Sequence, residues 1–545
     1  MPRTWFSASL LSRYTAFMCC LLLAAIGLWY QQHAEPGASW PLVTLVLGCL
    51  LGLVGVYDLL QPRRAVLRNY PVIGHIRYLV ESIRPEIRQY LLEADDDKLP
   101  FSRAQRSLVY QRAKNEPSEK PFGTLSNVYQ DGYEFIGHSM RPQPEAAPEQ
   151  LRVLVGGEQC RQRYSASVLN ISALSFGAMS ANAIRALNRG AQLGGFAHDT
   201  GEGSISPYHR EFGGDLIWEL GSGYFGCRDA RGQFDAARFA EQAQTAQVKM
   251  IEIKLSQGAK PGHGGILPGA KVTAEIAATR GVPMGVDCVS PAAHSAFSTP
   301  TELLEFIALL REKSGGKPVG FKLCIGHAWE FMGIVKAMLG SGITPDFIVI
   351  DGKEGGTGAA PVEFTNHIGM PMREGLLFAH NTLVGAGLRQ KMRLAASGKI
   401  VSAFDIACVL AIGADWSNSA RAFMFAVGCI QSQSCNTNKC PTGVATQDAL
   451  RQRALVVDDK SLRVHNYHRS TLKALAQILA AAGLSHPSQL RPLHLVRRVD
   501  SSRVQLFSQA HVFLQDGELL AGSTPHRFYA DSWRLARADR FDPGA

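Results

Sequence analysis

The chain has 545 residues, of which 46% are hydrophobic and 19% are charged, with 53 glycines and no Gly-x-y period. These values exclude a disordered chain and a collagen, and the length exceeds that of a small disulfide-stapled domain. Lysine and arginine outnumber aspartate and glutamate by 56 to 46, a net charge of +10. Much of the excess lies near the apolar N-terminal segments and near the C-terminus, so we expect no nucleic-acid groove.

Two apolar runs, about residues 15–30 and 40–60, predict a transmembrane hairpin within residues 1–68. Each run is close to the ~20 residues that a helix needs to cross a bilayer. Arginines precede the first run and follow the second, so the positive-inside rule predicts a two-pass protein of a bacterial-type inner membrane, with its catalytic part in the cytoplasm. A cleaved signal peptide is the alternative for the first run. A second apolar run follows at once, however, and no small-residue cleavage pattern closes the first.

Residues 69–150 are charged and helix-prone and end in a Pro-rich stretch, which predicts a helical pre-domain and linker; residues 491–545 are interpreted as a C-terminal extension. Between them, over residues 151–490, short β-rich runs alternate with helix-length segments. The runs begin near Val168, Gly195, Val248, Met284, Val319, Phe347, Met392 and Ala414. Their number and spacing predict an α/β fold of the (β/α)8 barrel type. A doubly wound sheet is the rival, but no Gly-x-Gly-x-x-Gly follows a strand here.

Chemistry in such a barrel collects at the carboxyl ends of the strands. Glycine-rich loops there let backbone amides approach a large planar or phosphorylated ligand, although any single glycine can equally serve a tight turn. A buried lysine at a strand end is costly unless it faces an anion, and the loops after strands seven and eight often hold a phosphate. We therefore predict bound FMN. The candidate cofactor residues are Ser175, Gly177, Ala178, Met179, Lys254, Gln257, Lys322, Gly356, Gly358, Ser397, Gly398 and Ser417.

Three of the 11 cysteines form a cluster, Cys429, Cys435 and Cys440, with the spacing C-x5-C-x4-C. Three thiolates on one loop suit a [3Fe-4S] cluster, whereas zinc prefers four ligands. A fourth cysteine from elsewhere, Cys408 or Cys324, would give a zinc or [4Fe-4S] site instead. Three structural cysteines without metal are a further alternative.

Several longer runs resemble the FMN-binding synthase domain of glutamate synthase over about residues 165–490. They are LSFGAMS, GEGS, KLSQGAKPGHGG, DGKEGGTGAAP and GCIQSQSCNTNKCPTGVATQD. The resemblance implies FMN in the barrel, a [3Fe-4S] cluster on the three cysteines, and reductive amination of 2-oxoglutarate to L-glutamate through 2-iminoglutarate and a hydride from reduced FMN. It assigns Lys260 and Arg280 to the two carboxylates of the oxo acid, with Glu202 in the same pocket.

The chain departs from this family at two positions of one loop. Where the family usually has KPGEGGQLPG, this chain has KPGHGGILPG, which introduces His263 and Ile266. Isoleucine donates no hydrogen bond to an oxo acid, so the substrate's identity stays open. His263 is a candidate catalytic residue because histidine titrates near neutral pH; the alternative is a loop histidine with no catalytic role.

Three functions remain open at this stage. The first is reductive amination of a 2-oxo acid, with ammonia free or from a separate amidotransferase subunit and electrons from a ferredoxin or a membrane reductase. The second is an N-methylglutamate synthase-like or other α-amino or α-hydroxy acid oxidoreductase with the same cofactors. The third is a non-catalytic, membrane-anchored flavin electron-transfer subunit, against which the Lys260 and Arg280 pair argues.

Overall fold

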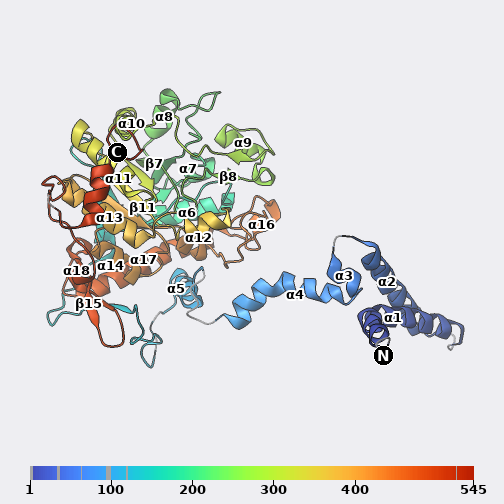
Figure 1. The fold of residues 1–545 in the computed structure, drawn as a ribbon. Helices are drawn as coiled ribbons and strands as arrows, with labels where there is room; N and C mark the ends of the chain where they lie inside the picture. The colour runs from blue at the N-terminus through green and yellow to red at the C-terminus, as the bar shows by residue number, and fades with distance from the viewer. Residues whose placement is uncertain are drawn as a thin grey trace. The chain divides into compact units, whose positions relative to one another are not determined.

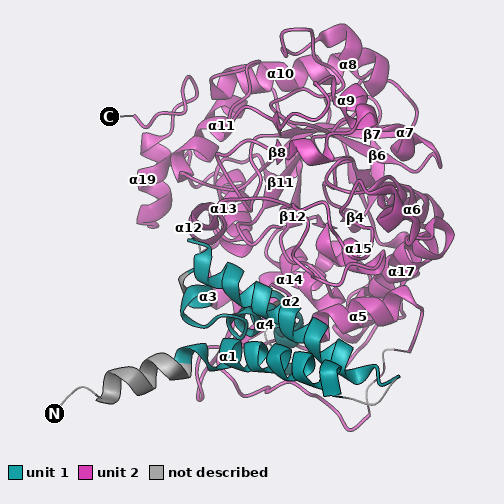
Figure 2. Cartoon of the chain, turned by 90° about the vertical axis from the view of Figure 1, so that its right-hand side faces the viewer, with its two compact units in different colours: residues 1–95 teal, residues 96–545 magenta. Residues whose placement is uncertain are grey.

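The chain divides into two structural units, residues 1–95 and 96–545 (Figure 2). The computed structural model describes residues 4–33, 37–62, 64–93, 100–117, 119, 121–522 and 524–544. Each unit is described by itself below.

The second unit is built on a closed barrel of eight parallel strands, as the sequence predicts. In barrel order the strands are β4 (Leu169–Ile171), β5 (His198–Asp199), β6 (Leu216–Leu220), β7 (Val248–Lys254), β10 (Val319–Leu323), β11 (Phe347–Asp351), β12 (Arg393–Ser397) and β13 (Trp416–Ser419). The ring closes where β13 pairs with β4, with Asn418 opposite Asn170. Helices cover the outside (Figure 1), chiefly α6 (Ala181–Gly194), α8 (Ala236–Ala243), α10 (Pro300–Lys313), α11 (Ala328–Ser341), α13 (Met372–Gly385), α14 (Ala403–Ala411) and α17 (Val457–Ala481).

One of the predicted strands is wrong. The run near Met284 contributes only β9 (Cys288–Val289), which pairs antiparallel with β8 (Ile266–Leu267) outside the barrel. The third barrel strand is instead β6, with the sequence LIWEL. Its Glu219 carries a charge into the barrel interior. The strand that ends in Lys254 is therefore the fourth of the barrel, not the third.

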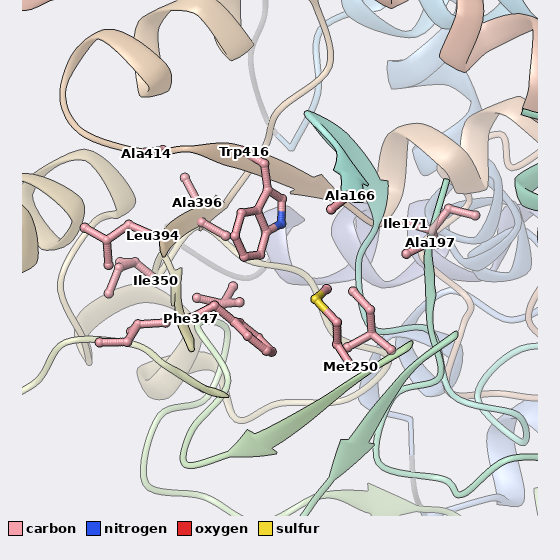
Figure 3. Close-up of a cluster of buried hydrophobic side chains, with 14 of the residues drawn as sticks. Ala166, Ile171, Ala197, Met250, Phe347, Ile350, Leu394, Ala396, Ala414 and Trp416 are labelled. Atoms are coloured by element: carbon pink, nitrogen blue, oxygen red, sulfur yellow. The ribbon is translucent and has the colours of Figure 1, made fainter. Parts of the chain in front are cut away.

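The barrel interior is layered. At the amino ends of the strands, Met250, Phe347 and Trp416 point toward one another in an apolar layer (Figure 3), and the last two rings lie 5.8 Å apart. All three side chains are fully buried, and each such side chain stabilises the fold by about 1.5–3 kcal/mol. Because side chains alternate along a strand, Met250, Glu252 and Lys254 share one face of β7. The interior thus changes from apolar to charged toward the carboxyl ends.

Segments before and after the barrel pack onto it. Helix α5 (Arg103–Ala113) begins with a capping box between Ser102 and Gln105 and packs against α17 and α15 (Arg421–Ala426). Strand β1 (Glu134–Ile136) joins β14 (Leu495–Arg498) and β15 (Val504–Leu506) in an antiparallel sheet. A second pair is β2 (Arg152–Val155) with β3 (Tyr164–Ser167), and α19 (Arg527–Leu535) contacts α11.

The first unit is helical. Helices α1 (Thr4–His33) and α2 (Trp40–Leu60) pack together and precede α3 (Ala65–Asn69), α4 (Gly74–Ile87) and the π-helix η1 (Arg88–Leu92). The segments Arg13–His33 and Trp40–Leu60 have mean hydropathies of 1.5 and 2.2, and by length and composition each suffices to cross a membrane. A Cβ on Gly48 would come within 2.4 Å of the Ala24 backbone nitrogen, so this glycine permits the close contact of α1 and α2.

Candidate functional site

A cluster of charged side chains lies at the carboxyl ends of the barrel strands. The Lys254 ammonium lies 3.2 Å from Glu202 Oε2 and 4.0 Å from Glu219 Oε1. Burial favours the neutral acid, but Lys254, followed by Arg280 and Lys260, outweighs it and lowers the pKa of Glu202. Three cations around one pocket carboxylate leave positive charge for an anionic ligand.

Two of these cations are almost fully buried. Lys260 is 3% exposed and Arg280 is 4% exposed. Arg280 Nη2 donates to the Phe176 carbonyl at 2.9 Å, and its guanidinium lies 5.3 Å from the centre of the Phe225 ring. Its Nε has no hydrogen-bond partner within the described residues. Burial lowers the pKa of Lys260, which Glu202 opposes. A buried donor without a partner costs free energy, which an anionic ligand would recover.

A small open pocket lies beside this cluster. Its lining includes Glu202, Lys254, Gln257, Gly262, His263 and, missed in the sequence, Ser222, Pro291 and Ala292. The Gln257 amide accepts from Lys254 at 3.2 Å and donates to the Gly356 carbonyl at 2.9 Å. The half-buried His263 ring meets the Phe364 ring edge to face at 5.3 Å. Ile266 lies nearby in sequence on β8 and is 39% exposed.

Lys322 lies in the barrel interior and pairs with carboxylates of the protein itself. Its ammonium contacts Glu219, Glu252 at 2.9 Å and Asp199 at 3.8 Å, and all four residues are at most 3% exposed. Carboxylate oxygens of the three acids lie within 4.8 Å of one another. The lysine contacts each acid of this set and thus supplies the positive charge that a metal ion would otherwise supply.

Three carboxylates sharing one ammonium leave an excess of buried negative charge. Burial raises the pKa of Glu252 to about 7, with Lys322 opposing and Glu219 reinforcing the shift. Burial and Glu252 likewise raise the pKa of Asp199. For Lys322, burial favours the neutral amine, but the carboxylates outweigh it and raise its pKa. The carboxylates of this cluster therefore share at least one proton near neutral pH.

The loop after β12 borders a second pocket, of about 600 Å³, lined by Gly398, Lys399, Glu354, Arg373, Asp405 and three apolar side chains. Gly398 and Lys399 both have positive φ, 155° and 49°. The Ser397 hydroxyl lies 3.3 Å from that of Ser172. The Ser417 hydroxyl instead donates to the Val168 carbonyl at 2.9 Å and is fully buried in the barrel wall.

Close packing explains some of the loop glycines. A Cβ on Gly258 would come within 1.8 Å of the Gly352 carbonyl oxygen, and one on Gly356 within 2.7 Å of Arg421 Nε. Gly358, in contrast, has no described atom within 4 Å of such a Cβ. Of these three glycines, only Gly358 has open space beside it for a ligand.

Lys271, which the sequence analysis missed, joins the first βα loop to the cysteine segment. Its ammonium donates to the carbonyls of Ala178 at 2.9 Å, Ala445 at 3.2 Å and Cys435 at 3.3 Å. Gln447 makes a second bridge, donating to the carbonyls of Gly177 at 3.0 Å and Met179 at 2.9 Å, while Ser175 lies against Gly201. No sequence signal identifies this bridge, because the partners of Lys271 come from loops that are distant in the chain.

The three clustered cysteines lie between α15 and α16 (Ala449–Arg453). Burial raises the pKa of Cys429 to about 12. Burial and the neighbouring Cys440 also raise the pKa of Cys435, and Lys271 opposes this second shift. Burial also disfavours the Cys440 thiolate, but backbone amides that include those of Ala445, Thr442 and Val444 outweigh it and lower its pKa. The surroundings therefore favour the thiolate at Cys440, while at Cys435 Lys271 offsets part of the cost of burial and at Cys429 burial dominates.

The two cysteines considered as a fourth ligand have surroundings of their own. Cys324 Sγ lies 3.5 Å from the Met370 carbonyl. Cys408 is fully buried in α14, and this burial raises the pKa of its thiol to about 12, which Arg373 opposes. The segment before the barrel contacts the cysteine loop instead, since the Tyr110 hydroxyl donates to the Cys429 carbonyl at 2.7 Å and Gln431 donates to the Phe101 carbonyl at 3.2 Å.

Comparison with known protein families places the chain. The family model described as the conserved region in glutamate synthase matches residues 138–485. The chain belongs to the glutamate synthase family. It is 37% identical over 507 residues to the glutamate synthase large subunit-like protein YerD of Bacillus subtilis (strain 168), covering 85% of this chain and 96% of that protein. This family membership agrees with the resemblance stated from the sequence.

More distant relatives in the same family match a part of their length. The archaeal-type glutamate synthase [NADPH] of Thermotoga neapolitana is 34% identical over 321 residues, 59% of this chain and 60% of that protein. The glutamate synthase [NADPH] large chain of Bacillus subtilis (strain 168) is 32% identical over 344 residues, 62% of this chain and 21% of that protein. The activities of those whole proteins are therefore not transferred to this chain by similarity alone.

Proposed function

We propose that this chain is an FMN-dependent and iron-sulfur-dependent oxidoreductase that reductively aminates a 2-oxo acid, with 2-oxoglutarate giving L-glutamate as the first candidate. One observation carries the proposal: Lys254, Lys260 and Arg280 gather around Glu202 at the carboxyl end of a glutamate synthase family barrel. The cationic pocket favours a dianionic substrate, and its position in the barrel is where the chemistry of this fold is found.

Lys260 and Arg280 are proposed to bind the two carboxylates of the acid. Arginine offers a planar fork of donors and lysine a compact charge, and both side chains are desolvated, which strengthens their attraction for an anion. Glu202 stays ionised beside Lys254 and suits an ammonium or imine N–H donor. Lys254 Nζ lies 3.2 Å from Glu202 Oε2, so this pair can hold a proton within the pocket.

The proposed FMN site extends from the Gln257 side of the mouth to the loop after β12. The residues that would hold FMN are the strand-end residues named from the sequence. Among them Gly358 borders open space and Gly398 lines the second pocket, where Lys399 contributes a cation for a phosphate. Cys429, Cys435 and Cys440 would hold a [3Fe-4S] cluster. When bound, FMN supplies the hydride and the cluster relays electrons to it. Lys271 and Gln447 bridge the two sites through the first βα loop.

Ile266 favours a second candidate function with the same cofactors. Its 39% exposed side chain offers an apolar contact where the family usually has a glutamine donor. A substrate with an apolar substituent, such as the methylamine of an N-methylglutamate synthase-like reaction, would suit this surface better than free ammonia. A non-catalytic electron-transfer subunit is disfavoured by the buried Lys260 and Arg280, whose desolvation has no structural purpose without an anion.

We further propose that α1 and α2 anchor the protein in a cytoplasmic membrane, with the barrel on the cytoplasmic side. The two apolar helices and the flanking arginines support this placement. A ferredoxin or a membrane reductase would then supply electrons, and free ammonia or a separate amidotransferase subunit the nitrogen.

The proposal is tested on the full chain purified in detergent. We expect a yellow protein that releases FMN on denaturation, carries about three irons per chain, and, once reduced, is reoxidised by 2-oxoglutarate plus ammonium with glutamate as product. Methylamine in place of ammonium tests the second candidate. Lys260→Ala should weaken acid binding while FMN stays bound, whereas the surface variant Lys313→Ala should behave like the parent. A colourless, iron-free protein would refute both candidates.

A further inference from the structure

Helix α4 and the π-helix η1 carry an uncovered apolar face. On α4, Ile76, Leu79, Val80 and Ile83 are 58%, 61%, 48% and 43% exposed. Ile73 before the helix and Tyr90, Leu91 and Leu92 on η1 are exposed as well. An apolar surface of this length on one helix is typical of a binding surface.

The apolar and basic side chains of α4 occupy neighbouring sectors of the helix. At about 100° per residue, the four apolar residues of α4 fall within a sector of roughly 100°. Arg77 and Arg84, seven residues apart, follow one another along the edge of that sector, and Arg77 pairs with Glu81 at 3.1 Å on the polar side. Over the described residues 64–93, five arginines (Arg64, Arg68, Arg77, Arg84, Arg88) exceed three glutamates (Glu81, Glu86, Glu93). An apolar sector edged by arginines is characteristic of helices that lie in a lipid interface.

The start of α4 is fastened to the end of the apolar helix α2. Asp58, fully buried near the end of α2, accepts a hydrogen bond from the Val72 backbone amide at 2.9 Å and contacts His75 Nε2 at 2.9 Å. These contacts hold the first turn of α4 at the level where the apolar span ends. An apolar span that crosses a bilayer ends at the headgroup region, so α4 starts there.

We propose that α4 and η1 lie along the surface of an anionic phospholipid leaflet, with Ile76, Leu79, Val80 and Ile83 in the acyl boundary and the arginines at the phosphates. This inference rests on the proposed membrane insertion of α1 and α2. The surplus of arginine over glutamate selects an anionic leaflet over a zwitterionic one. The experiment distinguishes this lipid contact from two alternatives, in which the face binds residues 96–545 of the same chain or a second copy of the protein.

The test uses the full chain in nanodiscs of phosphatidylglycerol, with the photo-crosslinking residue p-benzoylphenylalanine at single positions and mass spectrometry of the adducts. Leu79→p-benzoylphenylalanine should give at least fivefold more lipid adduct than the matched control Glu81→p-benzoylphenylalanine on the polar side. Nanodiscs of phosphatidylcholine should lower the adduct at position 79. Flavin content of each variant checks that the barrel is intact.

A third variant, Leu53→p-benzoylphenylalanine, reports on α2 itself, whose Leu53 is 67% exposed. Lipid adduct at position 53 without any at position 79 overturns the inference and leaves the membrane anchor standing. No lipid adduct at either position overturns both. Crosslinks from position 79 to residues 96–545, or to a second copy, assign the face to protein and overturn the inference as well.

Discussion

Replacing Glu252 with glutamine should stabilise the barrel at alkaline pH. Burial raises the pKa of Glu252 from its ordinary value of 4.5 to about 7. The unfolded chain therefore releases this proton first as the pH rises, so the free energy of unfolding falls between pH 4.5 and about pH 7 and stays low above that range. This difference between the two pKa values corresponds to a loss of about 3 kcal/mol in the free energy of unfolding. Glutamine keeps the shape and carries no charge, so Glu252→Gln removes this loss.

The assay is thermal unfolding of the full chain in detergent at pH 5 and pH 8.5. For the roughly 350 residues of the family region, about 3 kcal/mol corresponds to about 4 °C in Tm. We expect Glu252→Gln to exceed the parent by about this amount at pH 8.5 and by less than about 1 °C at pH 5. The surface variant Glu305→Gln should follow the parent at both values. A Tm difference that does not change with pH, or a less stable variant at pH 8.5, would refute the reasoning.

Three further predictions concern the loops. Gly258→Ala should lower Tm by several degrees, because the new Cβ would meet the Gly352 carbonyl oxygen at 1.8 Å. Gly358→Ala, at a position with open space, should leave Tm unchanged. Equal changes in Tm for the two variants would contradict the packing argument. Lys271→Met should leave three carbonyls without their shared donor and lower both Tm and bound iron. The surface variant Lys313→Met is the control. A Tm and an iron content equal to those of the parent would show that Lys271 does not hold the two loops together. Cys435→Ser should abolish bound iron, measured per chain, while Cys324→Ser should not; iron loss in both would favour a four-cysteine site.

The barrel was predictable because seven of its eight strands carry their own signal. Runs such as that beginning at Phe347 are apolar, β-rich and followed by a glycine turn. Strand β6 was missed, and the partner that makes its buried Glu219 tolerable, Lys322, lies about a hundred residues away in the chain. The run near Met284 has strand-like composition, yet it forms only the two residues of β9.

The candidate site was predictable where a residue follows a strand directly. Glu202, Lys254 and Gln257 meet at the mouth because parallel strands end on one side of the barrel. Lys322 and Ser417 contact the barrel interior and wall, and their role in cofactor binding stays a prediction. Lys271 could not be assigned, since its three carbonyl partners come from loops that are distant in sequence.

The contact between α5 and the cysteine loop determines where the chain should be truncated to obtain a water-soluble fragment. Phe101 and Tyr110 meet the Phe425 ring at 5.3 and 6.1 Å, and the Tyr110 hydroxyl also donates to the Cys429 carbonyl. A fragment that starts at position 120 keeps every barrel strand but removes the aromatic wall and the phenol beside Cys429, the first cysteine of the proposed cluster site. A truncation that spares redox behaviour therefore retains the chain from residue 100 onward.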